Sequence, residues 1–206
     1  MNGDNPHTIA PDLGQHLKQK GEIAVIPTDT VYGVVARVAD SQAVARLYRL
    51  KHREGKPGTV VAASIDQLVA IGIKYEYLKK VEQLWPGAVS VIIPCDQNLF
   101  YVHQGADSLA IRIPDNAGLL ELLKETGPLL TSSANQPGEP PATTVSEARA
   151  YFGDQVDWYE DGGIVQREPS TVVKIVDDAI EIVRQGAISF DGSLVSDAPE
   201  STKTVR

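Results

Sequence analysis

Residues 22–33 read EIAVIPTDTVYG, an apolar run that ends at a proline followed by hydroxyl, acidic and aromatic side chains. A short apolar run that stops at Pro-Thr-Asp-Thr is typical of a buried strand entering a loop. Loops that follow buried strands are where α/β proteins commonly bind ligands. The stretch therefore predicts a strand over residues 22–27 and a candidate binding loop around Thr30, although turn chemistry alone would also account for Thr-Asp-Thr.

The rest of the chain alternates between strand-like and helix-like stretches. Helices are predicted over residues 41–50, with Ser41 as N-cap, over 117–124 and over 145–151, and a mostly helical stretch over 65–84 is broken near Gly72. Further strands are predicted over 59–63, 89–94, 108–114, 128–132, 172–176 and 180–183. Strands and helices intermingle with both short and long connections, which favours one α/β domain with a mixed sheet over residues 8–190. Residues 191–206 contain little to bury and are predicted to form a flexible tail.

Composition limits the cellular context. The chain of 206 residues has one cysteine, Cys95, which excludes an internal disulfide and fits a reducing compartment. No stretch approaches the roughly 20 apolar residues that span a bilayer. The first ten residues, MNGDNPHTIA, do not resemble a signal peptide. We therefore expect a cytoplasmic protein that does not associate with membranes.

The charge of the chain is unevenly distributed. The formal net charge is −8, yet residues 1–60 carry eight Lys and Arg against six Asp and Glu. An acidic chain is a poor general binder of nucleic acid, because the phosphate backbone rewards positive charge spread over a surface. A local excess of cations suits a small anionic ligand better than a long one.

Two cations stand where a helical pattern stops. Lys51 and Arg53 flank His52 and are followed at once by EGKPG, residues 54–58, whose glycines and proline oppose a helix. Residues two apart diverge by about 200° on a helix but lie on the same side of an extended chain. The helix is therefore expected to end near Leu50, with both cations on one side of a loop. The alternative is a solvated basic helix end that complements the helix dipole.

Three more segments place polar groups beside strands. Residues 131–135, TSSAN, offer hydroxyl and amide groups that can hold phosphate oxygens, although a capped turn is equally compatible. Arg112 lies within an apolar strand, so it needs an acidic partner. That partner is either a ligand carboxylate or a structural pair with Asp29 or Asp115, unless the arginine faces outward. The segments around Ser170 and Arg184 are weaker signals.

Familiar catalytic motifs are absent from the sequence. It contains neither a Walker phosphate loop nor the Rossmann glycine pattern. Its four histidines are scattered and its single cysteine cannot build a zinc site, so no metal ligand is predicted from the chain. His103 is expected to be a loop or core residue.

Seven segments in order resemble the YrdC family, the L-threonylcarbamoyl-AMP synthases that begin synthesis of the t6A modification in tRNA. They are PTDTVYG (27–33), KHR (51–53), WPG (85–87), SLAIRIP (108–114), SSANQPGEPPAT (132–143), PSTVV (169–173) and VRQGAI (183–188). The resemblance implies a twisted mixed sheet flanked by helices around a concave cationic cleft. It also implies that L-threonine, bicarbonate and ATP are joined into threonylcarbamoyl-AMP with release of pyrophosphate. Mg²⁺ is expected only because ATP is a substrate.

The resemblance also implies roles for ten residues. Lys51 and Arg53 would be the catalytic cations. The residues expected to bind ATP are Lys51, Arg53, Ser108, Ser133, Asn135 and Arg184. Those expected to surround threonine are Thr30, Arg112, Thr131 and Ser170, with Arg112 facing the carboxylate. Hand-over of the product to t6A transferase proteins and a weak contact with tRNA are possible partner interactions.

The chain departs from the family pattern at three places, and two other functions stay open. Glu54-Gly55 interrupts the usual run after the cations. Some relatives have a histidine ligand near the position of Ala62, a contact that this chain lacks, and some have a nucleotide-contacting serine where this chain has Pro141. These departures concern the fine contacts to ATP. One alternative is a paralogue of the same fold that acts on another nucleotide or carbamoyl substrate. The other is a module that binds double-stranded RNA or tRNA, which the net charge disfavours.

Overall fold

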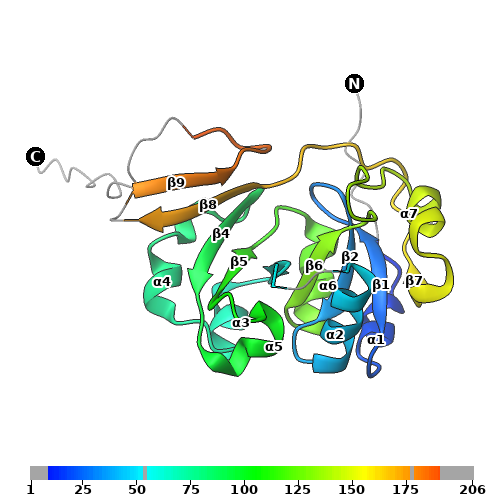
Figure 1. Ribbon diagram of the computed structural model, residues 1–206, viewed down its shortest axis with the longest axis horizontal. Helices are drawn as coiled ribbons and strands as arrows, with labels where there is room; N and C mark the ends of the chain where they lie inside the picture. The colour runs from blue at the N-terminus through cyan, green and yellow to red at the C-terminus, as the bar shows by residue number, and fades with distance from the viewer. Residues whose placement is uncertain (1–8, 53–54, 177–178, 191–206) are drawn as a thin grey trace, which may run out of the picture.

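A computed structural model describes residues 9–52, 55–176 and 179–190. Within those ranges the strands form one nine-stranded sheet in the order β7-β1-β2-β6-β3-β5-β4-β8-β9 (Figure 1). The strands are β1 (Ile23–Pro27), β2 (Tyr32–Arg37), β3 (Thr59–Val61), β4 (Val89–Pro94), β5 (Ser108–Arg112), β6 (Leu129–Ser133), β7 (Trp158–Tyr159), β8 (Thr171–Val176) and β9 (Ala179–Arg184). Parallel and antiparallel pairs both occur, so the predicted mixed α/β sheet is confirmed.

Helices pack on both faces of this sheet. They are α1 (Leu13–Leu17), α2 (Ser41–Leu50), α3 (Ile65–Ala70), α4 (Tyr75–Lys79), α5 (Phe100–His103), α6 (Ala117–Thr126) and α7 (Val145–Phe152). Short 3₁₀ turns lie at Glu82–Leu84, Gln97–Leu99 and Gly153–Gln155. No helix in the described ranges is long and apolar enough to cross a bilayer.

One face of the sheet carries the larger apolar core. Buried residues of α2, α3, α4, α5 and α7 pack there against strands from one end of the sheet to the other. Examples are Leu47 of α2 and Phe152 of α7, which join the same cluster as Ile111 of β5 and Val173 of β8. Burial of this continuous apolar surface is the main term that holds the sheet together.

The opposite face is covered over only part of its width. A second cluster joins α1 and α6 to strands β1, β2, β3 and β6 through residues such as Leu17, Leu123 and Val35. Its buried members, among the residues that the structure describes, do not include any from β4, β5 or β8. The uncovered part of this face is where the sheet carries its polar side chains, as described below.

Several details differ from the sequence-based expectations. Strand β2 was not predicted, although it pairs antiparallel with the whole of β1, from Ile23 opposite Ala36 to Pro27 opposite Tyr32. The N-cap of α2 is Asp40 and not Ser41, because the Asp40 carboxylate accepts hydrogen bonds from the backbone N–H groups of Gln42 and Ala43. Residues 191–206 lie outside the described ranges, so the expected tail and the 8–190 domain boundary stay predictions.

Candidate active site

A cavity of about 540 Å³ opens on the partly covered face of the sheet. Its size is within the range of roughly 300–1,000 Å³ that is usual for small-molecule sites. It draws residues from strands that are far apart in sequence but adjacent in the sheet. Among those that line it are Thr30, Ser108, Arg112, Thr131, Ser133, Ser170 and Arg184.

The alternation of side chains along each strand explains why polar groups gather there. In β5, Leu109 and Ile111 belong to the larger apolar cluster, whereas Ser108, Ala110 and Arg112 line the cavity. Successive residues of a strand point to opposite faces, so a polar-apolar alternation separates core from cavity. Strand β6 adds Thr131 to the same face, because Thr131 pairs with Thr59, which in turn pairs with Ala110.

One glycine makes room at the inner end of the cavity. Gly33 of β2 pairs with Ser133 of β6, and a Cβ atom at Gly33 would lie 2.6 Å from the hydroxyl oxygen of Thr131. A contact this short would force the threonine side chain to move. Glycine at this position therefore leaves the Thr131 hydroxyl at the cavity wall.

Arg112 forms a buried ion pair with Asp29. Its Nη1 donates to the Asp29 Oδ2 atom at 3.2 Å, and its Nη2 lies 3.1 Å from Oδ1. Nη1 also lies 3.4 Å from the hydroxyl of Thr30. The structural pair considered from the sequence is therefore present, and it joins the PTDT loop to β5. The Nε atom of Arg112 has no hydrogen-bond partner among the described residues.

Burial and the opposing charges set the ionisation of this pair. Removal from water raises the pKa of the Asp29 carboxyl, and the positive charge of Arg112 lowers it in part. Burial lowers the pKa of the Arg112 guanidinium, with the Asp29 charge opposing this shift and the nearby Arg184 charge adding to it. Arginine stays protonated in proteins, so the Arg112 side of the pair is cationic at neutral pH.

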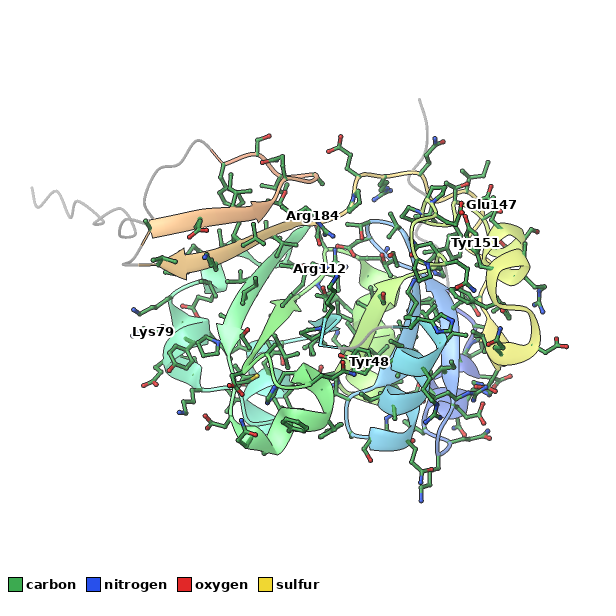
Figure 2. All side chains as sticks on the ribbon, in the orientation of Figure 1. Tyr48, Lys79, Arg112, Glu147, Tyr151 and Arg184 are labelled. Carbon is green, nitrogen blue, oxygen red and sulfur yellow. The ribbon has the colours of Figure 1, made fainter. Side chains whose placement is uncertain are left out.

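Ser170 and Arg184 form the cavity wall at the edge of the sheet. Arg184, at the end of β9, lies near Arg112 (Figure 2) and donates from Nη2 to the carbonyl oxygen of Ser170 at 2.7 Å. The Ser170 hydroxyl lies 3.0 Å from the hydroxyl of Ser90, which is fully buried in β4. This wall therefore presents one guanidinium and one hydroxyl, with Arg184 bonded to the Ser170 backbone and the Ser170 hydroxyl in contact with Ser90.

Lys51 lies beside a second, smaller cavity of about 450 Å³. Lys56 and Ser133 line both cavities, so the two are neighbours. Lys51 is nearly buried, with 4% of its surface exposed, and its Nζ donates at 2.8 Å to the carbonyl oxygen of Ser133 and at 2.8 Å to the Asn135 Oδ1 atom. The carbonyl oxygen of Asn135 accepts from the same ammonium. The cation at the end of α2 is thus bound to the TSSAN loop.

The structure brings together nine of the ten residues singled out in the sequence. Seven line the larger cavity, whereas Lys51 and Asn135 line the neighbouring one together with Ser133. Arg53 lies outside the described ranges. As expected, α2 ends at Leu50, so Lys51 follows the helix directly. The assignment of each residue to ATP or threonine stays a prediction.

Some lining residues were not anticipated. Thr59 and Lys56 line the larger cavity, and Ser90 supports Ser170 from behind. The signal for Ser90 is the alternation in residues 89–94, VSVIIP, where Val89, Val91 and Ile93 are core residues. Lys56 follows a glycine in an irregular segment, and no periodic pattern could have placed it at the junction of the two cavities.

The three departures from the family pattern lie in different surroundings. Pro141 lines the larger cavity, whereas Ala62 is fully buried in the core. Gly55 is exposed, and its preceding residue lies outside the described ranges. Of the three, only the Pro141 change is placed by the structure at the cavity wall.

No carboxylate lines the described walls of either cavity, and His52 is the one imidazole among the described lining residues. The one grouping of potential ligands in the described ranges is His16, Glu22 and Asp157, which does not line either cavity. In that grouping Asp157 forms an ion pair with Arg46. The described residues therefore do not fit a metal held by the protein at the candidate site.

Comparison with known proteins identifies the family. The family model named Sua5_yciO_yrdC and described as "Telomere recombination" matches residues 16–186, so the chain belongs to this family. The chain is 34% identical over 178 residues to a putative threonylcarbamoyl-AMP synthase of Mycobacterium tuberculosis, covering 83% of this chain and 81% of the relative. It is 33% identical over 163 residues to threonylcarbamoyl-AMP synthase of Pseudomonas aeruginosa, covering 77% and 88%.

Longer relatives and solved structures agree with this assignment. The threonylcarbamoyl-AMP synthase of Bacillus subtilis is 32% identical over 195 residues, and the match covers 90% of this chain but only 56% of the relative. The crystal structure of P. abyssi Sua5 complexed with L-threonine matches with a TM-score of 0.74 at 27% identity, covering 84% of this chain and 53% of that one. Escherichia coli YciO, at 23% identity and a TM-score of 0.72, supports the fold alone.

Proposed function

We propose that the protein is an L-threonylcarbamoyladenylate synthase, the enzyme of the first step in t6A modification of tRNA. The observation that carries the proposal is the pair of adjoining cavities, one with Arg112 at its wall and the other with Lys51 and the TSSAN loop. A small carboxylate-bearing substrate and a polyphosphate could be held side by side there. Family membership and relatives named threonylcarbamoyl-AMP synthase support the same reaction.

The reaction needs positioning more than it needs a nucleophilic side chain. Bicarbonate supplies carbon dioxide, which the neutral threonine amine captures as a carbamate with loss of a proton. A carbamate oxygen then forms a bond to the α-phosphorus of ATP, and the bond to the β-phosphate oxygen breaks to release pyrophosphate. Two anions must meet, so catalysis consists chiefly of orientation and of neutralising charge.

The threonine side is assigned to the Arg112 wall. Asp29 occupies the edge of the guanidinium formed by Nη1 and Nη2, whereas Nε is without a partner among the described residues. Nε–H and the second hydrogen of Nη2 point in parallel and match the two oxygens of a carboxylate. We therefore assign the threonine carboxylate to this side-on edge, with hydroxyls of Thr30, Thr131 and Ser170 around the rest of the amino acid.

The ATP side is assigned to the cations and the small polar groups. Lys51 and Arg53 would neutralise the phosphates, and Ser133 and Asn135 would hold the nucleotide from the opposite wall. Ser108 and Arg184 would contribute from the larger cavity. Because the Lys51 ammonium is bound to the TSSAN loop in the structure, its contact with a phosphate requires an exchange of partners. Lys56, exposed where the two cavities meet, adds a further positive charge.

Metal, partners and location complete the proposal. Mg²⁺ would arrive bound to the phosphates of ATP, since the described walls offer no carboxylate ligand. The concave site would be cationic overall. The unstable product would pass to t6A transferase proteins, and a weak tRNA contact at the same concave surface is compatible with this. A tRNA-modification role fits a cytoplasmic location.

One assay tests the function. Pyrophosphate release from ATP is measured with L-threonine and bicarbonate each omitted in turn, and the proposal requires that both are needed. Release that is independent of threonine would instead favour a paralogue with another acceptor. Binding of tRNA without any turnover of ATP would favour a binding module, a reading that the net charge of −8 disfavours.

A further inference from the structure

The wall formed by Ser170 and Arg184 is built from a part of the sheet with little other support. Strand β9 pairs only with β8 in the described sheet, and its residues 181–184 are exposed. The pairing is irregular between Val172 and Val173, next to where Arg184 pairs. An edge strand of this kind frays readily. Something else must therefore fix the end of β9 at the cavity.

The segment after β9 turns back across the start of β8. The N–H of Ala187 donates to the carbonyl oxygen of Pro169 at 2.9 Å. Gly186 lies directly against the same backbone, since a Cβ atom there would be 2.2 Å from the Pro169 oxygen and 2.7 Å from that of Ser170. No side chain can be accommodated without moving one of the two segments. Residues 186–188 thus form a strap over residues 169–171, beyond the arrowhead of β9 and beside the start of β8 in Figure 1.

The hydroxyl of Thr171 binds the backbone of this strap. It accepts hydrogen bonds from the N–H groups of Gly186 at 3.1 Å and Ile188 at 3.0 Å, and it donates to the carbonyl oxygen of Ile188 at 2.5 Å. Thr171 is fully buried, and it does not line either cavity. One side chain therefore satisfies three backbone groups of a segment that makes no ladder with a neighbouring strand.

We propose that Thr171 is a positioning residue whose hydroxyl ties residues 186–188 to the start of β8 and so fixes Ser170 and Arg184 in the cavity wall. Its immediate neighbour Ser170 carries the hydroxyl at the wall, and Arg184 donates to the Ser170 carbonyl two residues before the strap begins. Release of the strap frees both groups at once. The proposal rests on the proposed function, because it assigns these two groups to substrate capture.

The test compares Thr171→Val with Thr171→Ser. Valine keeps the shape but removes the hydroxyl, whereas serine restores it. We expect Thr171→Val to raise KM for ATP and for threonine by roughly tenfold, the equivalent of one or two lost hydrogen bonds, and to leave kcat at saturation within about threefold. Thr171→Ser should return both KM values to within about threefold of the original protein.

Thr126→Val is the matched control for a purely structural effect. Thr126 is also a buried threonine, and its hydroxyl donates to backbone oxygens at the end of α6, but it does not line either cavity. This variant should lower Tm without changing either KM. All assays are run well below the lowest Tm, so loss of folded protein does not enter the rates.

A second readout does not depend on catalysis. Amide hydrogen exchange of Gly186 and Ile188 should be slow in the original protein and in Thr171→Ser, and at least about tenfold faster in Thr171→Val. Should Thr171→Val fail to fold, Gly186→Ala disrupts the strap from the other side and should raise both KM values. The proposal is overturned if the strap loses protection while both KM values stay unchanged, or if Thr171→Val leaves the protection itself unchanged. Absence of activity in the original protein would contradict the proposed function instead, and the exchange measurement would still test the strap.

Discussion

Replacement of Arg112 by lysine tests whether the cavity needs only a positive charge at this position or also the planar shape of the guanidinium. Lysine keeps the positive charge that Asp29 requires, but its ammonium is a point donor without the planar fork. In the structure Nη1 and Nη2 of the guanidinium contact Asp29, at 3.2 and 3.1 Å, whereas Nε has no partner among the described residues. A lysine that satisfies Asp29 has no second edge for a carboxylate.

The expected size follows from the contacts that would be lost. Two hydrogen bonds to a ligand carboxylate disappear, and a charge-assisted hydrogen bond contributes about 1.5–3 kcal/mol. Part of this is recovered from the retained charge, so a loss of about 1.5–3 kcal/mol in total is expected, which is roughly 10- to 150-fold in KM for threonine. Because only 3% of the Arg112 surface is exposed, screening by solvent should not reduce the effect much.

The assay is pyrophosphate release titrated with threonine at saturating ATP and bicarbonate. KM for ATP should change less than KM for threonine, and Arg184→Lys should show the reverse preference because Arg184 is assigned to ATP. Thermal unfolding of both variants confirms that the fold survives. An Arg112→Lys protein that is folded and has an unchanged KM for threonine would refute the assignment of the carboxylate to this arginine.

Three further outcomes are expected. Lys51→Ala and Arg53→Ala should each reduce the rate of pyrophosphate release by roughly 10²–10³, as is usual on removal of one electrostatic stabiliser; release that matches the original protein would contradict those roles. Asp40→Ala should lower the stability by about 1–2 kcal/mol and Tm by roughly 2–8 °C in a thermal scan, because α2 loses its N-cap. Burial raises the pKa of the Asp40 carboxyl, but the hydrogen bonds that it accepts from backbone N–H groups outweigh burial and hold the pKa below 3.8. The stabilisation by this N-cap is therefore present above pH 3.8 and disappears as the pH falls through the pKa of the folded protein. Burial, with Asp107 and Asp96, raises the pKa of the Cys95 thiol to about 11, so its alkylation followed by mass spectrometry should be slow at pH 8 and rise about tenfold per pH unit up to that value.

Local patterns were enough to predict most strands and the longer helices. Residues 89–94 coincide with β4, and residues 41–50 coincide with α2. The predictions failed where the pattern was short or was attributed to a motif. Strand β2 was not predicted even though Val34, Val35 and Ala36 form a buried apolar run, and β7 has only two residues. Helix α1 has five residues and no side-chain cap hydrogen bond.

The sequence predicted which residues belong to the site, but not which of them contact one another. Arg112 and Asp29 are 83 positions apart, and Lys51 and Asn135 are 84 apart. Nothing local in the sequence says that β6 lies between β2 and β3, yet this order is what brings TSSAN to Lys51. The sequence required a partner for Arg112 on grounds of burial, but only the folded chain distinguishes Asp29 from Asp115 and from a ligand.

The two faces of the sheet have different roles: one carries the larger apolar core and the other carries the polar residues of the cavity. The face toward α2, α5 and α7 carries a continuous apolar core across the sheet, so strands β4, β5 and β8 bury apolar side chains there even where the opposite face has no helix over it. That opposite face is covered by α1 and α6 only over β1, β2, β3 and β6. The rest of that face can therefore carry serine, threonine and arginine without exposing the core. It follows that substitutions at cavity positions such as Ser108 should affect substrate capture more than folding. Substitutions at the next position, such as Leu109→Ala, should instead lower the free energy of unfolding by about 2–5 kcal/mol and affect substrate capture less.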